Sequence, residues 1–177
     1  MIHTRIRKIL IFALALVLLP ACFFARTEAL AASAPLNLVD FFSEHSRLDL
    51  EPYRGKALFL NFFTEWCPYC MEEMPDIKQA FEAYSQDELQ IILVHVWDGE
   101  DASHSESIRT RFGLEALTFF EDEDRGLAQL VGLPGYPTSL FIDKEGHQHT
   151  GTSGQLSYEQ IAKVLDAMGV AKTPAAQ

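Results

Sequence analysis

Cysteine is scarce in this chain of 177 residues, which has three: Cys22, Cys67 and Cys70. The first lies in an N-terminal segment with the character of an export signal, so the folded domain carries a single pair. A bridge between Cys67 and Cys70 would close too short a loop to constrain the unfolded chain appreciably. The sequence therefore argues against a small exported domain held together by several disulfides.

Basic residues are also few, because 14 Lys and Arg stand against 25 Asp and Glu, for a net charge of −11. Three of the basic residues, Arg5, Arg7 and Lys8, belong to the N-terminal segment. Without them the net charge falls to about −14. So acidic a domain repels the phosphate backbone, which argues against a nucleic-acid-binding function.

A comfortably long apolar run is missing as well. The N-terminal apolar stretch covers residues 9–19 after a basic start, and it is short for a membrane span unless residues 21–25 are counted with it. A basic start followed by such a stretch is typical of an export signal. It would deliver the domain to the periplasm or the extracytoplasmic face of the membrane, with the basic end in the cytoplasm.

Three fates of this signal remain open. Residues 19–22, Leu-Pro-Ala-Cys, resemble a bacterial lipobox, in which cleavage leaves Cys22 lipidated. Residues 29–31, Ala-Leu-Ala, form an acceptable site for ordinary signal peptidase. The segment could also stay uncleaved as a helical anchor. We expect a signal peptide or membrane anchor over residues 1–24, a linker over 25–35, one domain over 36–169 and a flexible tail over 170–177.

The motif Trp66-Cys67-Pro68-Tyr69-Cys70 carries the chemistry. Residues 57–63 before it are apolar and aromatic except for Asn61, which predicts a buried strand. Residues 68–84 after it predict a helix with one apolar stripe, kinked at Pro75. Cys67 is then expected at the helix N-terminus, where free N–H groups and the macrodipole favour a thiolate. The motif predicts thiol–disulfide exchange.

The cysteine pair has two other interpretations. It could be half of a structural zinc site, but a second cysteine pair is absent from the sequence. The available histidines do not fall at a spacing typical of zinc ligands: His95, His104, His147 and His149. The pair could also be an inert bridge, which the short loop disfavours.

The remaining pattern predicts alternating strands and helices. Strands are expected over residues 47–50, 90–97, 117–120, 138–143 and 147–150, and helices over 105–112, 125–131 and 157–168. Ser157 is a suitable N-cap for the last helix. A β-α-β unit followed by a hairpin and a helix predicts an α/β fold with a mixed central sheet and helices on both faces.

Two blocks of sequence resemble the thioredoxin superfamily, and within it the exported TlpA/ResA/CcmG-like oxidoreductases. They are Leu-Asn-Phe-Phe-Thr-Glu-Trp-Cys-Pro-Tyr-Cys at 60–70, continued by Glu73-Met74-Pro75, and Gly-Tyr-Pro-Thr-Ser-Leu-Phe-Ile-Asp-Lys-Glu-Gly at 135–146. The resemblance implies a thioredoxin-like fold in which the two blocks meet. It also implies a cis bond before Pro137, which packs against the active-site disulfide. We therefore expect Trp66, Tyr136 and Pro137 to bind substrate.

The sequence departs from the thioredoxin pattern at two places: the residue that moves the proton of the second thiol, and the dipeptide between the cysteines. Asn61 replaces an aspartate that in cytosolic thioredoxins helps to move a proton to or from the second thiol. In the exported branch a carboxylate follows the next strand, so Asp98 is the expected proton relay, with Glu100 and then Glu65 as further candidates. The Pro-Tyr dipeptide beside the thiolate is expected to tune the reduction potential.

The expected function is a periplasmic thiol–disulfide oxidoreductase that reduces disulfides of exported proteins. Cys67 attacks and Cys70 resolves the mixed disulfide, with no cofactor beyond the redox-active Cys67–Cys70 pair. The resemblance implies exported thiol proteins as clients, among them apocytochrome c, and a membrane thiol-electron donor as the source of electrons. Net oxidation of clients remains open. An alternative of another class is a copper or zinc carrier that uses the same cysteines.

Overall fold

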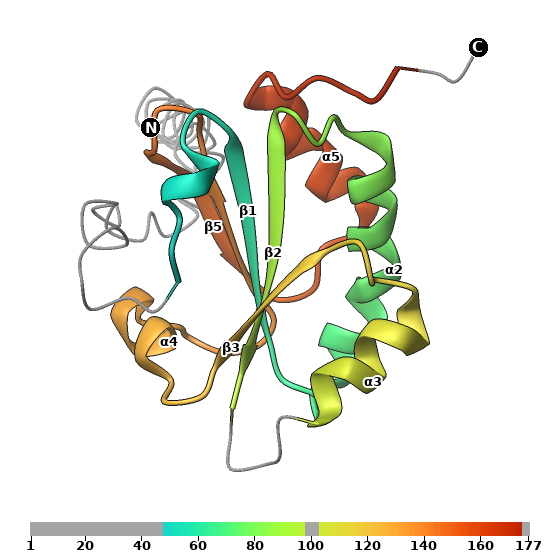
Figure 1. Cartoon of the computed structure of the whole chain (residues 1–177), viewed down its shortest axis with the longest axis vertical. Helices are drawn as coiled ribbons and strands as arrows, with labels where there is room; N and C mark the ends of the chain where they lie inside the picture. Colours follow the sequence, from blue (N-terminus) through green and yellow to red (C-terminus); the bar gives the residue numbers. More distant parts are fainter. Residues whose placement is uncertain (1–47, 98–102, 175–177) are drawn as a thin grey trace, which may run out of the picture. The chain divides into compact units, whose positions relative to one another are not determined.

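A computed structural model describes residues 48–97 and 103–174. Cys22 and the expected signal and linker lie outside the described residues, as do Asp98 and Glu100. The fold is α/β, built on one five-stranded sheet in the order β3-β2-β1-β4-β5 (Figure 1). The strands are β1 (Ala57–Phe63), β2 (Leu89–Val96), β3 (Thr118–Asp122), β4 (Thr138–Ile142) and β5 (Gln148–Ser153).

The sheet is mixed, as the sequence predicts. β1 pairs in parallel with β2, and β2 with β3, while β4 runs antiparallel to both β1 and β5. Because β1, β2 and β3 are parallel, their carboxyl ends meet at one edge of the sheet. That edge is where Cys67 follows β1.

Helices cover both faces of the sheet (Figure 1). They are α2 (Pro68–Ala83), α3 (Ser103–Phe112), α4 (Gly126–Val131) and α5 (Tyr158–Ala167), and a short 3₁₀ helix, η2 (Glu51–Tyr53), precedes β1. Alternate residues of β1 point to opposite faces. Phe59 and Phe63 pack in one core cluster with α2, α3 and α5, while Leu60 and Phe62 pack in a second with α4.

Most predicted elements are confirmed within a few residues. The first predicted strand is wrong, because residues 48–50 form no strand and lead into η2. Leu48 and Leu50 are nevertheless buried in the second core cluster, so their side chains produce the apolar signal without any backbone pairing. Pro75 lies inside α2. Ser157 is the N-cap of α5 and forms a capping box with Gln160.

The chain after α5 returns to the end of α2. Val170 is buried, the Ser85 N–H donates to the carbonyl oxygen of Ala171, and Lys172 pairs with Tyr84 in an isolated bridge. No helix within residues 48–97 and 103–174 is long and apolar enough to cross a membrane.

Candidate active site

Cys67 and Cys70 form a disulfide at the start of α2. Cys67 is the N-cap of that helix, and its sulfur accepts a hydrogen bond from the Cys70 backbone N–H at 3.2 Å. Pro68 occupies the first helical turn, where the missing N–H costs no hydrogen bond. This position supplies the free N–H groups and the positive helix end that stabilise a thiolate. The sequence-based placement of Cys67 is confirmed.

The two cysteines differ in their access to solvent. Cys67 is 3% exposed and Cys70 is completely buried. Of the two cysteines, Cys67 is therefore the one nearer to solvent.

Aromatic side chains surround the motif at the surface. Trp66 is 56% exposed and Tyr69 is 62% exposed, which is unusual for side chains of this size. The Trp66 ring meets the ring of Tyr136 edge to face, with their centroids 6.0 Å apart. The two sequence blocks thus come together in space, as their resemblance implied.

The second block enters from the strand beside β1. The Tyr136–Pro137 peptide bond is cis, which confirms the expectation for that bond. Thr138 pairs with Phe62 of β1, and its hydroxyl donates to the carbonyl oxygen of Gly135 at 2.8 Å. Trp66, Tyr136 and Pro137, the residues expected to bind substrate, therefore belong to the same end of the molecule as Cys67.

Glu73 is a site residue that sequence reasoning missed. It lies three positions after Cys70 on α2, so both side chains lie on the same face of the helix, and both are completely buried. Oε1 accepts the Leu156 backbone N–H at 3.1 Å, and Oε2 accepts Nδ2 of Asn61 at the same distance. A buried carboxyl group one turn from the second thiol is suited to hold its proton.

Burial raises the pKa of Glu73 from its ordinary 4.5 to about 7. The hydrogen bonds from Leu156 and Asn61 stabilise the charged form and offset part of that effect, while the nearby carboxylate of Asp76 adds to the rise. A group with a pKa near neutrality can both take up and release a proton under physiological conditions.

Asn61 connects this acid to the neighbouring strand. The Nδ2 atom of Asn61 donates to Glu73 and also to the hydroxyl oxygen of Ser139 at 3.0 Å. Among the described residues, Asn61 Oδ1 and the Thr64 hydroxyl are buried without a hydrogen-bonding partner. The position that holds a buried aspartate in cytosolic thioredoxins thus carries an amide here, and the carboxyl group that this amide contacts lies on α2.

The other candidate acids are placed differently. Asp98 and Glu100 lie outside the described residues, so Asp98 stays a prediction. Glu65 is half-buried directly before Trp66.

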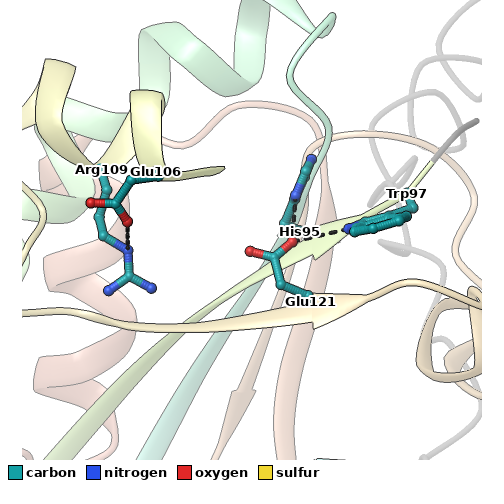
Figure 2. Close-up of polar contacts among 5 residues, drawn as sticks. All are labelled: His95, Trp97, Glu106, Arg109 and Glu121. Carbon is teal, nitrogen blue, oxygen red and sulfur yellow. Dashed lines mark hydrogen bonds and ion pairs between the residues drawn. The ribbon is translucent and has the colours of Figure 1, made fainter. Parts of the chain in front are cut away.

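A second polar cluster lies at the same edge of the sheet (Figure 2). His95 Nδ1 and Glu121 Oε2 are 2.7 Å apart, and Trp97 Nε1 donates to the same oxygen at 3.0 Å. The His95 ring also stacks on Phe63, with centroids 5.1 Å apart. The cluster joins the ends of β2 and β3 beside β1.

Hydrogen bonds stabilise the charged form of Glu121 and so lower its pKa. Burial alone would raise the pKa of Glu121. Hydrogen bonds from His95, Ser105 and Trp97 outweigh that effect and hold the pKa below its ordinary value. Nearby, Arg109 forms an ion pair with Glu106 at 3.7 Å (Figure 2) and lies over the Phe119 ring.

Within the part of the chain that the structure describes, no three His, Cys, Asp or Glu side chains come together as a metal site.

Comparison with protein families gives one match over most of the chain. The model described as the AhpC/TSA family matches residues 20–147. Two relatives are thiol-disulfide oxidoreductases named ResA. The protein of Geobacillus thermodenitrificans is 30% identical over 166 residues, which cover 94% of each chain. That of Geobacillus kaustophilus is 33% identical over 150 residues, which cover 82% of this chain and 83% of the relative.

Solved structures agree on the fold. StoA from Bacillus subtilis superposes with a TM-score of 0.58 at 23% identity, covering 64% of this chain and 85% of its own. The exposed lipoprotein thioredoxin of Streptococcus pneumoniae has a TM-score of 0.58 at 25% identity, covering 67% of this chain and 89% of its own. These similarities show a thioredoxin-like α/β fold.

Proposed function

The chain belongs to the AhpC/TSA family of the thioredoxin superfamily and is a thiol–disulfide oxidoreductase, and we propose that it reduces disulfides of exported proteins outside the cytoplasm. The observation that carries this proposal is the Cys67–Cys70 disulfide at the N-terminus of α2, with a buried acid one turn further along.

The reaction begins with the reduced protein. The Cys67 thiolate attacks one sulfur of a client disulfide, so that a bond forms between Cys67 and the client and the second client sulfur leaves as a thiolate that takes up a proton. Cys70 then loses its proton and attacks the sulfur of Cys67, which releases the first client sulfur. The client gains two electrons, and the protein becomes the Cys67–Cys70 disulfide.

Glu73 is the proposed acceptor of the Cys70 proton. It shares a buried helix face with Cys70, and its pKa of about 7 allows the transfer near neutrality. Asn61 cannot titrate, which leaves Glu73 to fill that role. Asp98, the acid expected from the resemblance, remains the other candidate.

The client surface comprises the aromatic side chains around Cys67. Trp66 and Tyr69 offer large exposed rings, and Tyr136, in the segment just before β4, packs edge to face against Trp66. Aromatic residues that are partly exposed are enriched in protein-binding sites.

The basic, then apolar start of the chain supports export and retention near the membrane. We propose that residues 1–24 act as the signal or anchor, that residues 25–35 form a linker, and that residues 36–169 form the domain. Residues 170–172, expected in a flexible tail, pack against the end of α2 and belong to the domain as well. A lipid on Cys22 or an uncleaved N-terminal helix would tether it. By resemblance, the clients include apocytochrome c, and a membrane thiol-electron donor restores the reduced pair.

The alternative, a copper or zinc carrier, would need a third ligand beside the cysteines. No observation on the described residues favours it.

The test is the reduction potential of the Cys67–Cys70 pair, measured in glutathione or dithiothreitol buffers, together with reduction of insulin. A potential close to that of thioredoxin, about −270 mV, with insulin reduction supports the proposal. A potential close to about −120 mV, as in a strong oxidant of thiols, would contradict reduction as the direction of flow.

A further inference from the structure

We propose that Ser139 is a positioning residue for the reaction: its hydroxyl holds the Asn61 amide with the NH₂ group toward Glu73 and so keeps that carboxyl group ready to accept a proton. The inference rests on the proposed role of Glu73 and deepens it. It adds a residue on β4 to machinery otherwise built from β1 and α2.

The register of β1 and β4 places Asn61 next to Ser139. Asn61 and Ser139 occupy partner positions on the antiparallel strands β1 and β4, and both side chains are completely buried. Side chains at partner positions project to the same face of the sheet. The face is that of α2, because Asn61 also reaches Glu73 on that helix.

The two N–H groups of the Asn61 amide are both used. One donates to Glu73 Oε2 at 3.1 Å and the other to Ser139 Oγ at 3.0 Å. An amide has two such donors on nitrogen and acceptor capacity on oxygen alone. The nitrogen side is therefore saturated, while Oδ1 has no partner among the described residues.

The orientation of the amide decides which form of Glu73 it stabilises. With nitrogen toward the carboxyl group, the amide stabilises the charged form. Rotated by half a turn, it would present Oδ1, which can only accept a hydrogen bond and so would stabilise the protonated form. In the first orientation the Ser139 hydroxyl accepts the second amide hydrogen, so both amide hydrogens are paired in this buried site.

The groups around Glu73 limit what else could set its charge. On α2 the titratable neighbours are Cys70 and Asp76. β1 and the segment before α5 contribute neutral donors, the Asn61 amide and the Leu156 N–H. Asp76 raises the pKa of Glu73, and the two donors lower it. Loss of the Asn61 donor should therefore push the titration of Glu73 to higher pH.

The experiment compares Ser139→Ala and Ser139→Thr, because threonine keeps the hydroxyl. Thr152→Ala is the matched control. Thr152 is the partner of Ser139 on β5, so this variant also removes a hydroxyl from the same face of the sheet. The protein is purified as exported and then reduced. Titration of the Glu73 carboxyl carbon is followed by NMR, and the rate of the Cys70 step is followed with a small aromatic disulfide. Circular dichroism confirms that each variant is folded.

Ser139→Ala should raise the midpoint of the Glu73 titration by about 0.5 to 1 pH unit, and should slow the Cys70 step about threefold to tenfold below that midpoint. Ser139→Thr and Thr152→Ala should keep the wild-type midpoint. An unchanged midpoint in Ser139→Ala overturns the inference, and so does an equal shift in Thr152→Ala or Ser139→Thr. If Ser139→Thr does not fold, Ser139→Ala and Thr152→Ala decide alone.

Glu73→Gln separates this inference from the proposed function. If Glu73→Gln abolishes the pH dependence of the Cys70 step while Ser139→Ala leaves the midpoint unchanged, only the role of Ser139 fails. If Glu73→Gln leaves the Cys70 step and its pH profile intact, the proposed role of Glu73 fails and the inference falls with it.

Discussion

Trp66 and Tyr136 meet edge to face at the mouth of the active site, although one precedes Cys67 and the other precedes Pro137 near the far end of the chain. Each ring therefore limits the movement of the other. A fixed exposed indole loses little conformational entropy when a client covers it, which favours binding.

Trp66→Ala should weaken the use of protein clients. We expect KM for a protein disulfide to rise about threefold to tenfold, because an aromatic contact is lost, while the rate with a small disulfide reagent changes little. Leu130→Ala on α4 is the control, since Leu130 is another large apolar side chain at the surface, 40% exposed, and α4 covers the other face of the sheet. Equal losses with both kinds of substrate would speak against a binding role for Trp66.

Replacing each cysteine by serine in turn shows which thiol attacks the client and which resolves the mixed disulfide. Cys70→Ser should accumulate mixed disulfides with clients, because Cys67 still attacks but nothing resolves the complex. Cys67→Ser should accumulate few, since Cys70 is completely buried. The complexes are counted on non-reducing gels after acid quenching. Comparable trapping by both variants would contradict the assignment.

Glu73 should make stability depend on pH. Its pKa is about 7 in the folded protein against an ordinary 4.5, so between these values the folded state holds a proton that the unfolded state has lost. Stability from this group is fully present below pH 4.5 and is lost as the pH rises through 7, by roughly 3 kcal/mol in total. Urea unfolding of the oxidised protein at several pH values measures the loss.

Glu73→Gln is the comparison for that measurement. Glutamine keeps one acceptor oxygen and cannot titrate, so the variant should show a flatter dependence on pH between 5 and 8, whatever its absolute stability. A wild-type slope that persists unchanged in Glu73→Gln would assign the effect to other groups.

Two variants distinguish Glu73 from Asp98 as the group that accepts the Cys70 proton. If Glu73 is the acceptor, Glu73→Gln should slow reduction of a model disulfide about tenfold or more near pH 7 and flatten the pH profile. If Asp98 is the relay, Asp98→Asn should instead slow the reduction and flatten the pH profile, while leaving the fold intact. Stopped-flow rates for both variants across pH 5.5–9 identify the acid. Wild-type rates and profiles in both variants would leave Glu100 as the next residue to change, and Glu65 after it.

Glu121 should stabilise the protein at neutral pH. Its folded-state pKa is lowered, so its contribution is present above the ordinary value of 4.5 and is lost as the pH falls through the lower folded value. Glu121→Gln should thus unfold at lower urea concentration at pH 7, with a difference from wild type that shrinks toward pH 3. A constant difference at all pH values would mean that the charge of Glu121 is not what matters.

The local parts of the site could be predicted from sequence. Residues 57–63 form a buried strand because nearly every side chain is apolar, and Cys67 caps the next helix because Pro68 follows it. These signals lie within a few residues of one another. The weaker strand at 147–150 proved longer, Gln148–Ser153, because an edge strand with exposed polar residues carries little apolar pattern.

The sequence did not predict Glu73 as a buried acid, because the groups that surround it are distant from it along the chain. The apolar stripe of α2 passes through Met74 and Ile77, and a charged residue directly before Met74 counts as solvent-facing in such a pattern. Glu73 is buried because Asn61 and Leu156 supply donors, and Leu156 lies 83 positions away along the chain. A buried charge of this kind becomes recognisable only when its partners are known.

The separation of these partners along the chain has a consequence for folding. Cys67, Cys70 and Glu73 are near neighbours in the sequence, but the Leu156 N–H reaches Glu73 only when the segment before α5 lies against α2. Until then Glu73 is an ordinary surface glutamate, ionised at neutral pH and unable to store a proton there. A partly folded molecule in which this segment has not docked would therefore carry the Cys67–Cys70 motif without the buried acid beside it.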